Sequence, residues 1–238
     1  MARAAKFFGL VPAGGAGRRF GGAVPKQYAS LGPKTVIEHS VSALLADARV
    51  SQVFVVCAPD DTVGPALFEN HPQVVCLPLA GAERVNTVLN AVNHLLEQLL
   101  VCETDWLLVH DAARPGLRAS DLSGLIDAAS EHVAGGLLAL PVADTLKKAA
   151  MTDTGEVISL QTVSRQALWA AQTPQMFRAQ ALSLAIAEAL YKGAVITDEA
   201  SAVETMGISP LIVKGHLQNM KITQPEDLGL VSTLMGVG

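Results

Sequence analysis

Short apolar runs alternate with amphipathic segments along the first part of the chain. Runs at 7–13, 52–59, 74–79, 106–112 and 135–142 carry few polar residues and are typical of strands buried on both faces. Between them, residues 35–47 and 83–100 repeat apolar side chains at a helical period, which predicts amphipathic helices. A further helix is expected to begin at Ser120 as its N-cap. This alternation predicts a doubly wound α/β fold whose mainly parallel sheet is covered on both faces.

The rhythm breaks between residues 143 and 173. Two β-prone stretches flank MTDTGE, a turn by its Asp and Gly content, so the segment predicts a hairpin rather than another strand and helix. Beyond it we expect helices at 178–193 and 197–207, strands at 210–215 and 220–223, and a last helix opened by Pro225. Without repeats or a linker, residues 1–238 are expected to form one domain from which 143–165 protrudes as an arm.

Composition narrows the class of protein. Half of the 238 residues are hydrophobic, and the formal net charge of −5 comes without an acidic or basic block. General binding to nucleic acid or to anionic membranes is therefore not expected, and no apolar run is long enough to span a bilayer. The cysteines Cys57, Cys76 and Cys102 form no metal-binding pair. With no signal peptide at the start, we expect a cytoplasmic protein with reduced thiols.

Candidate chemistry begins where the first predicted strand ends, in PAGGAGRR, with Lys26 shortly after it. Glycines let backbone N–H groups approach phosphate oxygens, and the arginines and the lysine add mobile positive charge. The spacing of a Walker loop is absent, and Phe20 stands where a dinucleotide fingerprint has its third glycine. The stretch therefore predicts a site for a phosphate compound. An ordinary glycine turn with solvated basic residues is the alternative.

Two further segments fall where they could join that site. VHDAARP places Asp111, which can hold Mg²⁺ or orient a polyol hydroxyl, near Arg114, which can pair with a phosphate. GAERVNT puts Gly81 and Thr87 at the start of a helix, where free N–H groups and a hydroxyl can meet a ligand. The alternative is structural: Asp111 caps a turn with Arg114 as its ion-pair partner, and Glu83 complements the helix dipole.

In this order, the motifs of the chain resemble those of the 2-C-methyl-D-erythritol 4-phosphate cytidylyltransferases of the non-mevalonate isoprenoid pathway. The resemblance covers residues 7–231 and rests on PAGGAGRR, PKQY, VHDAARP, PVADTLKKA, TPQMF, TDEASAVE and NMKIT. It implies a Rossmann-like nucleotidyltransferase fold, and transfer of a cytidylyl group from CTP to methylerythritol phosphate with Mg²⁺ as cofactor. The alternatives are another acceptor such as ribitol 5-phosphate, a non-catalytic nucleotide-binding module, and a dinucleotide-dependent oxidoreductase.

The resemblance also implies roles for single residues. Arg19 and Lys26 match the pair that stabilises the transition state at the α-phosphate, and Arg165 and Lys221 match the pair that positions the acceptor. The positions matching the acceptor's surroundings are Asp111, Arg114, Thr145, Thr173 and Thr197, and those matching the nucleotide's are Ala13, Gly14, Gly15, Gly17, Arg18, Gly81 and Thr87. Magnesium is expected mainly on the triphosphate, with Asp111 as the candidate protein ligand.

The arm implies a homodimer, because in the family it crosses to the neighbouring subunit. Thr145 and Arg165 would then serve the partner's site. The apolar residues of the arm, which are Leu146, Val157, Ile158 and Leu160, have no evident place in the core of one domain. The alternative is a hairpin folded back on its own domain.

The chain departs from the family pattern at several positions. Gly14 stands where the family often has Ala, and Ala80 where it often has Gly. Phe20 replaces a usual Met, and Ala82 replaces a common acidic residue, which leaves the strength of CTP binding open. Thr87 replaces a frequent Ser but keeps the hydroxyl.

Overall fold

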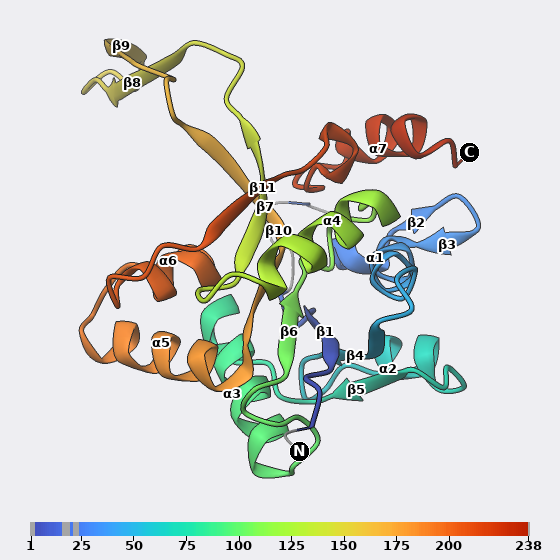
Figure 1. Ribbon diagram of the computed structural model, residues 1–238. Helices are drawn as coiled ribbons and strands as arrows, with labels where there is room; N and C mark the ends of the chain where they lie inside the picture. The colour runs from blue at the N-terminus through green and yellow to red at the C-terminus, as the bar shows by residue number, and fades with distance from the viewer. Residues whose placement is uncertain (1–2, 16–19, 21–23, 238) are drawn as a thin grey trace.

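A seven-stranded sheet forms the centre of the computed structural model, which describes residues 3–15, 20 and 24–237 (Figure 1). The strands are β1 (Phe7–Pro12), β4 (Val50–Val56), β5 (Val74–Leu77), β6 (Trp106–Val109), β7 (Gly136–Pro141), β10 (Trp169–Arg178) and β11 (Leu211–Lys214). They lie in the order β11-β7-β10-β6-β1-β4-β5. Neighbours are parallel except at β10, which is antiparallel to both β6 and β7. The predicted mainly parallel sheet is confirmed.

Helices cover both faces of the sheet. On one face lie α1 (Val36–Leu44), α2 (Val63–Phe68) and α4 (Ala119–Ser130), and on the other α3 (Arg84–Glu97), α5 (Ala179–Tyr191) and α6 (Glu199–Glu204). Because successive strand residues point to opposite faces, Val53 and Val55 of β4 pack with α1, whereas Phe54 and Val56 pack with α3. This double cover explains why the strands read as continuous apolar runs.

Shorter elements complete the fold: the 3-10 helices η2 (Lys26–Tyr28) and η3 (Leu217–Asn219), the strand pair β2 (Ser30–Leu31) and β3 (Lys34–Thr35), and the last helix α7 (Asp227–Met235). Val231 of α7 packs with Leu31 and Ile222 in a separate apolar cluster. No helix in the described ranges is long and apolar enough to cross a membrane.

Two local predictions were wrong and one short helix was missed, each for a physical reason. The N-cap of α4 is Arg118 rather than Ser120, and the Arg118 guanidinium pairs with Asp121 in the first turn at 2.6 and 2.8 Å. Residues 220–223 form no strand. Their apolar character comes from the burial of Ile222 against α7. The six-residue helix α2 is too short to show a helical period, and it was not expected.

The strand order reverses at β1, which lies between β4 and β6. The chain leaves β1 through α1 to β4 on one side, and it later returns to β6 on the other side. Loops that leave the carboxyl ends of β1 and β6 therefore diverge over opposite halves of the sheet. Such a point opens a crevice, where ligands bind in folds of this kind.

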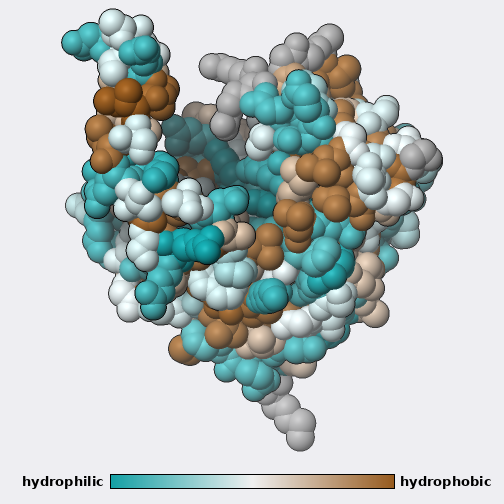
Figure 2. All heavy atoms as spheres, turned by 90° about the horizontal axis from the view of Figure 1, so that it is seen from above, coloured by the Kyte–Doolittle hydropathy of each residue, from teal (hydrophilic) through white to brown (hydrophobic). Residues whose placement is uncertain are grey.

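The predicted hairpin is present as β8 (Leu146–Met151) and β9 (Val157–Val163), an antiparallel pair that extends away from the main sheet (Figure 1). Its apolar side chains are exposed, with Met151 at 74%, Val157 at 70% and Leu160 at 57%. Hydrophobic side chains accordingly gather on the arm in Figure 2. The strand β10 returns from the arm and enters the main sheet between β6 and β7.

Candidate active site

A cavity opens where β1 and β6 end, beside the first turn of α3. Its wall comes from the loop after β1, the segment before α3, the loop after β6 and the chain at Lys221. In Figure 2, hydrophilic side chains line the hollowed face next to the arm. The predicted site residues that line the cavity are Ala13, Gly14, Gly15, Lys26, Gly81, Thr87, Asp111 and Lys221. The predicted Gly17, Arg18 and Arg19 lie outside the described residues.

Gln27 of η2 fixes the backbone of the glycine loop. Its buried side-chain amide donates to the carbonyls of Ala13 at 2.9 Å and Gly15 at 3.2 Å. Ala13 is tied to the sheet as well, because its N–H donates to the Val56 carbonyl at 2.8 Å. Gln27 was not predicted as a site residue, since an uncharged side chain gives no signal of a phosphate site. The PKQY motif contains it.

Thr87 shapes the segment 81–87 with its hydroxyl. Its Oγ1 accepts a hydrogen bond from the Gly81 N–H at 2.9 Å and donates to the Glu83 carbonyl at 3.1 Å. The residue is buried, and it belongs to the second turn of α3. Gly81 and Thr87 are both in the wall of the cavity, as predicted. The Thr87 hydroxyl was predicted to contact the nucleotide. In the structure it instead makes hydrogen bonds within the 81–87 segment.

Asp111, just beyond β6, is the centre of a charge cluster. Its Oδ1 accepts from Arg84 Nε at 2.9 Å, and its Oδ2 faces Lys221 Nζ at 2.8 Å and Arg114 Nε at 3.4 Å. Arg84 is itself held by both oxygens of Glu199, at 2.6 and 3.0 Å. Three cations against two carboxylates give the cluster a net positive charge, which suits an anionic ligand.

The cluster keeps Asp111 and Arg84 ionised. Burial raises the pKa of Asp111, but Arg84, Lys221 and Arg114 outweigh burial and hold that pKa well below its usual range. Burial also opposes the charge of Arg84. The carboxylates of Glu199 and Asp111 outweigh it and raise the pKa of this guanidinium above its ordinary value. Asp111 therefore stays a carboxylate and Arg84 a cation at neutral pH.

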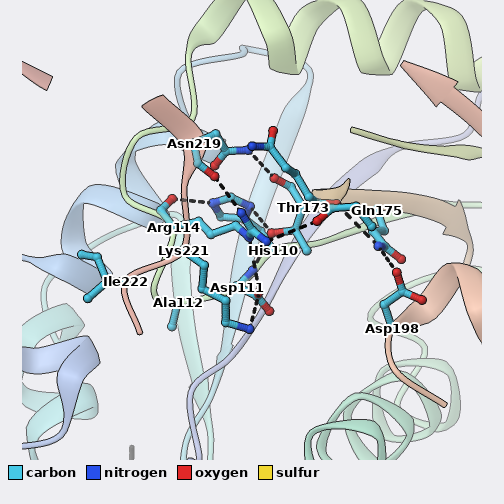
Figure 3. A network of polar contacts seen from close by, with 12 residues as sticks. His110, Asp111, Ala112, Arg114, Thr173, Gln175, Asp198, Asn219, Lys221 and Ile222 are labelled. Atoms are coloured by element: carbon cyan, nitrogen blue, oxygen red, sulfur yellow. Dashed lines mark hydrogen bonds and ion pairs between the residues drawn. The ribbon is translucent and has the colours of Figure 1, made fainter. Parts of the chain in front are cut away.

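A neutral network lies behind the cluster (Figure 3). Thr173 Oγ1 accepts from the Asp111 N–H at 3.0 Å and lies 3.0 Å from His110 Nδ1, while His110 Nε2 lies 3.0 Å from the Arg114 carbonyl. Because a carbonyl only accepts, Nε2 carries the ring proton and Nδ1 accepts from the Thr173 hydroxyl. Burial lowers the pKa of His110 to about 4, so the ring is neutral. Thr173, predicted beside the acceptor, directs its hydroxyl into this network.

The segment after η3 brings two lysines together at the cavity. The Ile222 N–H donates to the Ala113 carbonyl at 2.9 Å, which pairs this segment with the loop after β6. On the other side of the same residue, Lys26 Nζ donates to the Ile222 carbonyl at 3.0 Å. Lys221 immediately precedes Ile222 and reaches Asp111. The predicted catalytic residues Lys26 and Lys221 therefore share one wall.

The remaining predicted acceptor residues lie apart from the main cavity. Thr197 lines a second, smaller cavity, which shares Glu83 and Arg84 with the first. Thr145 and Arg165 are exposed, on the two segments that join the arm to the main sheet. Neither of them is in the wall of these two cavities. Their acceptor roles stay predictions.

Arg84 and Glu199 are functional candidates that the sequence analysis missed. Both stand inside motifs that it quoted, Arg84 in GAERVNT and Glu199 in TDEASAVE. A charged residue in the first turn of a helix is usually solvated, so neither had a signal of its own. Their pairing depends on how the first turns of α3 and α6 meet in the fold, and sequence periodicity does not contain that information.

A resident metal centre does not fit the residues present. Both oxygens of Asp111 already face cations, and a carboxylate paired in this way is a poor ligand for another cation. Among the described residues, no group of three or more His, Cys, Asp or Glu could hold a metal ion. Asp111 as a magnesium ligand stays a prediction that the charge cluster does not favour.

The fold and the site define a class of protein. A cationic cavity at the switch point of a parallel sheet, walled by a glycine loop and two lysines, is what a nucleotidyltransferase requires. The particular family follows from the sequence comparison: a model of 2-C-methyl-D-erythritol 4-phosphate cytidylyltransferase matches residues 8–236. The chain belongs to this family.

Relatives and solved structures agree along the whole chain. The 2-C-methyl-D-erythritol 4-phosphate cytidylyltransferase of Vibrio atlanticus (strain LGP32) is 47% identical over 221 residues, 93% of this chain and 91% of that protein. That of Neisseria meningitidis serogroup C is 46% identical over 230 residues, 97% of both chains. A crystal structure of 4-diphosphocytidyl-2C-methyl-D-erythritol synthase superposes with a TM-score of 0.84 at 42% identity, covering 98% of this chain and 100% of that one. A Francisella tularensis relative gives a TM-score of 0.80 at 30% identity, covering 97% and 100%.

Proposed function

We propose that the protein transfers the cytidylyl group of CTP to 2-C-methyl-D-erythritol 4-phosphate, giving 4-diphosphocytidyl-2-C-methyl-D-erythritol and pyrophosphate. A phosphate oxygen of the acceptor forms the new bond to the α-phosphorus. The bond from that phosphorus to the β-phosphate oxygen breaks, and its electron pair leaves with pyrophosphate. The observation that carries the proposal is the meeting of Lys26, Lys221 and Asp111 at one cavity, from three distant segments of a chain that belongs to this family.

The reaction needs no general base, which agrees with the chemistry of the site. The second pKa of a phosphate monoester is about 6, so the acceptor is mostly a dianion at neutral pH. His110, the histidine nearest to Asp111 in sequence, is fully buried, and both of its ring nitrogens have partners. It has no free position from which to take a proton. The task of the site is instead to bring two anions together.

The cations of the cavity perform that task. Lys26 lies beside the glycine loop and is assigned, with Arg19, to the charge that develops at the α-phosphate. Lys221, held by Asp111 at 2.8 Å, is assigned to the acceptor phosphate, together with Arg165. The 13–15 and 81–87 segments are assigned to the base and ribose of CTP, since both present backbone groups to the cavity. Hydrogen-bonding sites of this kind discriminate strongly between bases.

Magnesium is proposed to enter on the triphosphate of CTP rather than on protein ligands. Its contribution when bound is to neutralise phosphate charge. Chelation with EDTA should then abolish pyrophosphate release from CTP but leave the Tm of the ligand-free protein unchanged. A fall in that Tm would reveal a resident metal that supports the fold.

The arm is proposed to form a homodimer with shared sites. Its exposed apolar residues (Met151, Val157 and Leu160) would be covered by a symmetry-related copy of the chain. Arg165 and Thr145, which are not in the wall of either cavity described above, would reach the cavities of the partner.

We also propose a cytoplasmic location, where the three cysteines would stay reduced.

A pyrophosphate-release assay tests the proposed function. CTP, UTP, ATP and GTP are each supplied with methylerythritol phosphate, and CTP is then supplied with ribitol 5-phosphate and other polyol phosphates. We expect pyrophosphate release only when CTP is supplied together with methylerythritol phosphate. Equal release with a purine nucleotide would contradict the assignment of the base-binding segments. Faster release with ribitol 5-phosphate would show that ribitol 5-phosphate, and not methylerythritol phosphate, is the preferred acceptor. If no acceptor supported release, the protein would be a non-catalytic nucleotide-binding module.

A further inference from the structure

Glu199 is buried and pairs with Arg84, whose side chain is 29% exposed at the edge of the cavity. Glu199, the first residue of α6, has a side chain that is 2% exposed, and its two oxygens accept from Arg84 Nη1 at 2.6 Å and Nη2 at 3.0 Å. The remaining nitrogen of the guanidinium, Arg84 Nε, donates to Asp111 Oδ1 at 2.9 Å. The guanidinium therefore bridges two carboxylates that come from different elements. Its plane is fixed by the bidentate contact.

The first turn of α6, which carries Glu199, is itself held by the main sheet. Gln175 of β10 accepts from the Ala200 N–H through Oε1 at 2.8 Å, and its Nε2 donates to Asp198 Oδ2 at 2.8 Å (Figure 3). Asp198 in turn caps α6, with its Oδ1 accepting from the Ser201 N–H at 2.9 Å. The first turn of α6, and Glu199 with it, is thus locked to a buried strand. Glu199 has little freedom to move.

The pair determines which side of Asp111 faces the cavity. Arg84 occupies Oδ1, so Oδ2 is left for Lys221, at 2.8 Å. Without Arg84, the carboxylate could rotate toward either remaining cation. Glu199 does not line the main cavity, whereas Arg84, Asp111 and Lys221 do. Glu199 lines the second, smaller cavity instead, and its contact with the main cavity runs through Arg84, which lines both.

We propose that Glu199 and Arg84 are positioning residues of the transfer reaction. Glu199 fixes the guanidinium of Arg84, Arg84 fixes the carboxylate of Asp111, and Asp111 holds Lys221 toward the phosphate of the polyol acceptor. This inference rests on the proposed function for the identity of the acceptor. A purely structural role would be different: the pair would only join α6 to α3, and any replacement that restores packing would serve equally well.

The first test separates turnover from nucleotide binding. Glu199→Gln keeps the shape of the side chain but removes its charge, and a misaligned Asp111 and Lys221 should lower kcat about 10- to 100-fold. The Kd of CTP, measured by calorimetry, should change little, because Gln27 and Thr87, rather than Glu199, hold the backbone of the 13–15 and 81–87 segments. Glu204→Gln is the matched control, at the exposed end of the same helix, and should behave as wild type. Wild-type kcat in Glu199→Gln would overturn the proposal.

The second test separates positioning from stability. Removing one partner of a buried ion pair leaves a costly lone charge, whereas replacing both partners with apolar residues often restores stability. Arg84→Met combined with Glu199→Leu should therefore recover the Tm lost by either single variant, but kcat should stay low. If kcat returned to the wild-type value together with Tm, the pair would be structural and the proposal would be wrong.

A crystal structure of the double variant gives a readout that does not depend on activity. We expect the Asp111 carboxylate to rotate and its contact with Lys221 to lengthen. An unchanged Asp111 would overturn the positioning role, whatever the kinetics show. If instead wild-type protein released no pyrophosphate with any acceptor, the proposed function would fail, while the orientation of Asp111 would still decide the role of the pair.

Discussion

Lys26 is the residue on which we expect the transfer step to depend most directly. It lines the cavity beside the glycine loop, and its ammonium group is placed by the carbonyl of Ile222, 196 positions further along the chain. A positive charge held in advance stabilises the transition state most, because no reorganisation is needed when negative charge develops. The contribution of Lys26 to the rate therefore depends on the packing that brings distant segments together in the wall of the cavity.

Lys26→Ala and Arg19→Ala should lose turnover with little loss of CTP affinity. Removing one donor from a site of developing charge typically costs about 10²–10³ in rate. Steady-state kinetics with CTP and methylerythritol phosphate measure kcat, and calorimetry measures the Kd of CTP. Lys34→Ala, which removes an exposed lysine in β3, is the control. Near-normal turnover in Lys26→Ala or in Arg19→Ala would contradict the role assigned to that residue.

His110 should make the fold sensitive to acid. Its pKa is lowered from 6.5 to about 4 by burial, so the unfolded chain takes up a proton first as the pH falls. The stability that the neutral ring provides is complete above pH 6.5 and is lost as the pH falls toward 4. Between pH 7.5 and 5 this loss is about 2 kcal/mol.

Urea unfolding of His110→Gln measures that contribution. The amide preserves one donor and one acceptor but does not titrate, so the variant should lose less free energy of unfolding between the two pH values than wild type. His71→Gln, at an exposed histidine, should keep the wild-type pH dependence. The same slope in all three proteins would show that His110 is not the titrating group.

Among the elements, the loops after β1 and β5 show a compensating exchange. A Cβ added to Gly14 would clash with the Cβ of Ala80, so only one of the two positions has room for a methyl group. These are two of the positions at which the chain departs from the family pattern. The structure links the two departures, because the methyl group of Ala80 leaves no room for one at position 14.

Gly14→Ala alone should destabilise the loop and raise the KM for CTP, with an overpacking cost of about 1–3 kcal/mol. Adding Ala80→Gly should restore both quantities, because neighbouring substitutions couple. Gly15→Ala is a control for stability, since its added methyl group meets no atom of the described residues within 4 Å. A double variant as impaired as Gly14→Ala would contradict the exchange.

The elements also show what periodicity can and cannot predict. Every apolar run of the first half became a strand or helix, because burial on both faces leaves a strong signal. Strand β10 was not predicted, since its polar residues Gln172, Thr173 and Gln175 hide a buried strand. These side chains are buried because they bind other segments, and the sequence does not show those partners. The same limit hid Arg84 and Glu199, whereas Asp111 followed a recognisable strand and Lys26 a recognisable glycine loop.

For the whole molecule, the decisive prediction concerns shared sites. Lys26→Ala and Arg165→Ala chains, each inactive alone, are refolded together. If Arg165 acts in the partner's site, each mixed dimer has one intact site and one with both lesions. Random mixing then restores roughly a quarter of wild-type activity.

The control for this experiment is the pair Lys26→Ala and Lys221→Ala, whose residues line one cavity of one chain. Mixing these two should restore nothing. No recovery for Lys26→Ala with Arg165→Ala, when mixed dimers have been demonstrated by differential tagging, would rule out the shared site. Arg165 would then not act in the partner's site.

The place of β10 in the sheet has a consequence for protein synthesis. Strands β1, β4, β5 and β6 can pair as soon as they leave the ribosome, but the other edge of β6 must wait for β10. Strand β7 waits too, because both of its neighbours, β10 and β11, are made after it. Until residue 178 has emerged, the growing chain therefore carries an open, apolar strand edge at its centre. We expect translation pauses within the arm to be the point at which this protein most needs a chaperone.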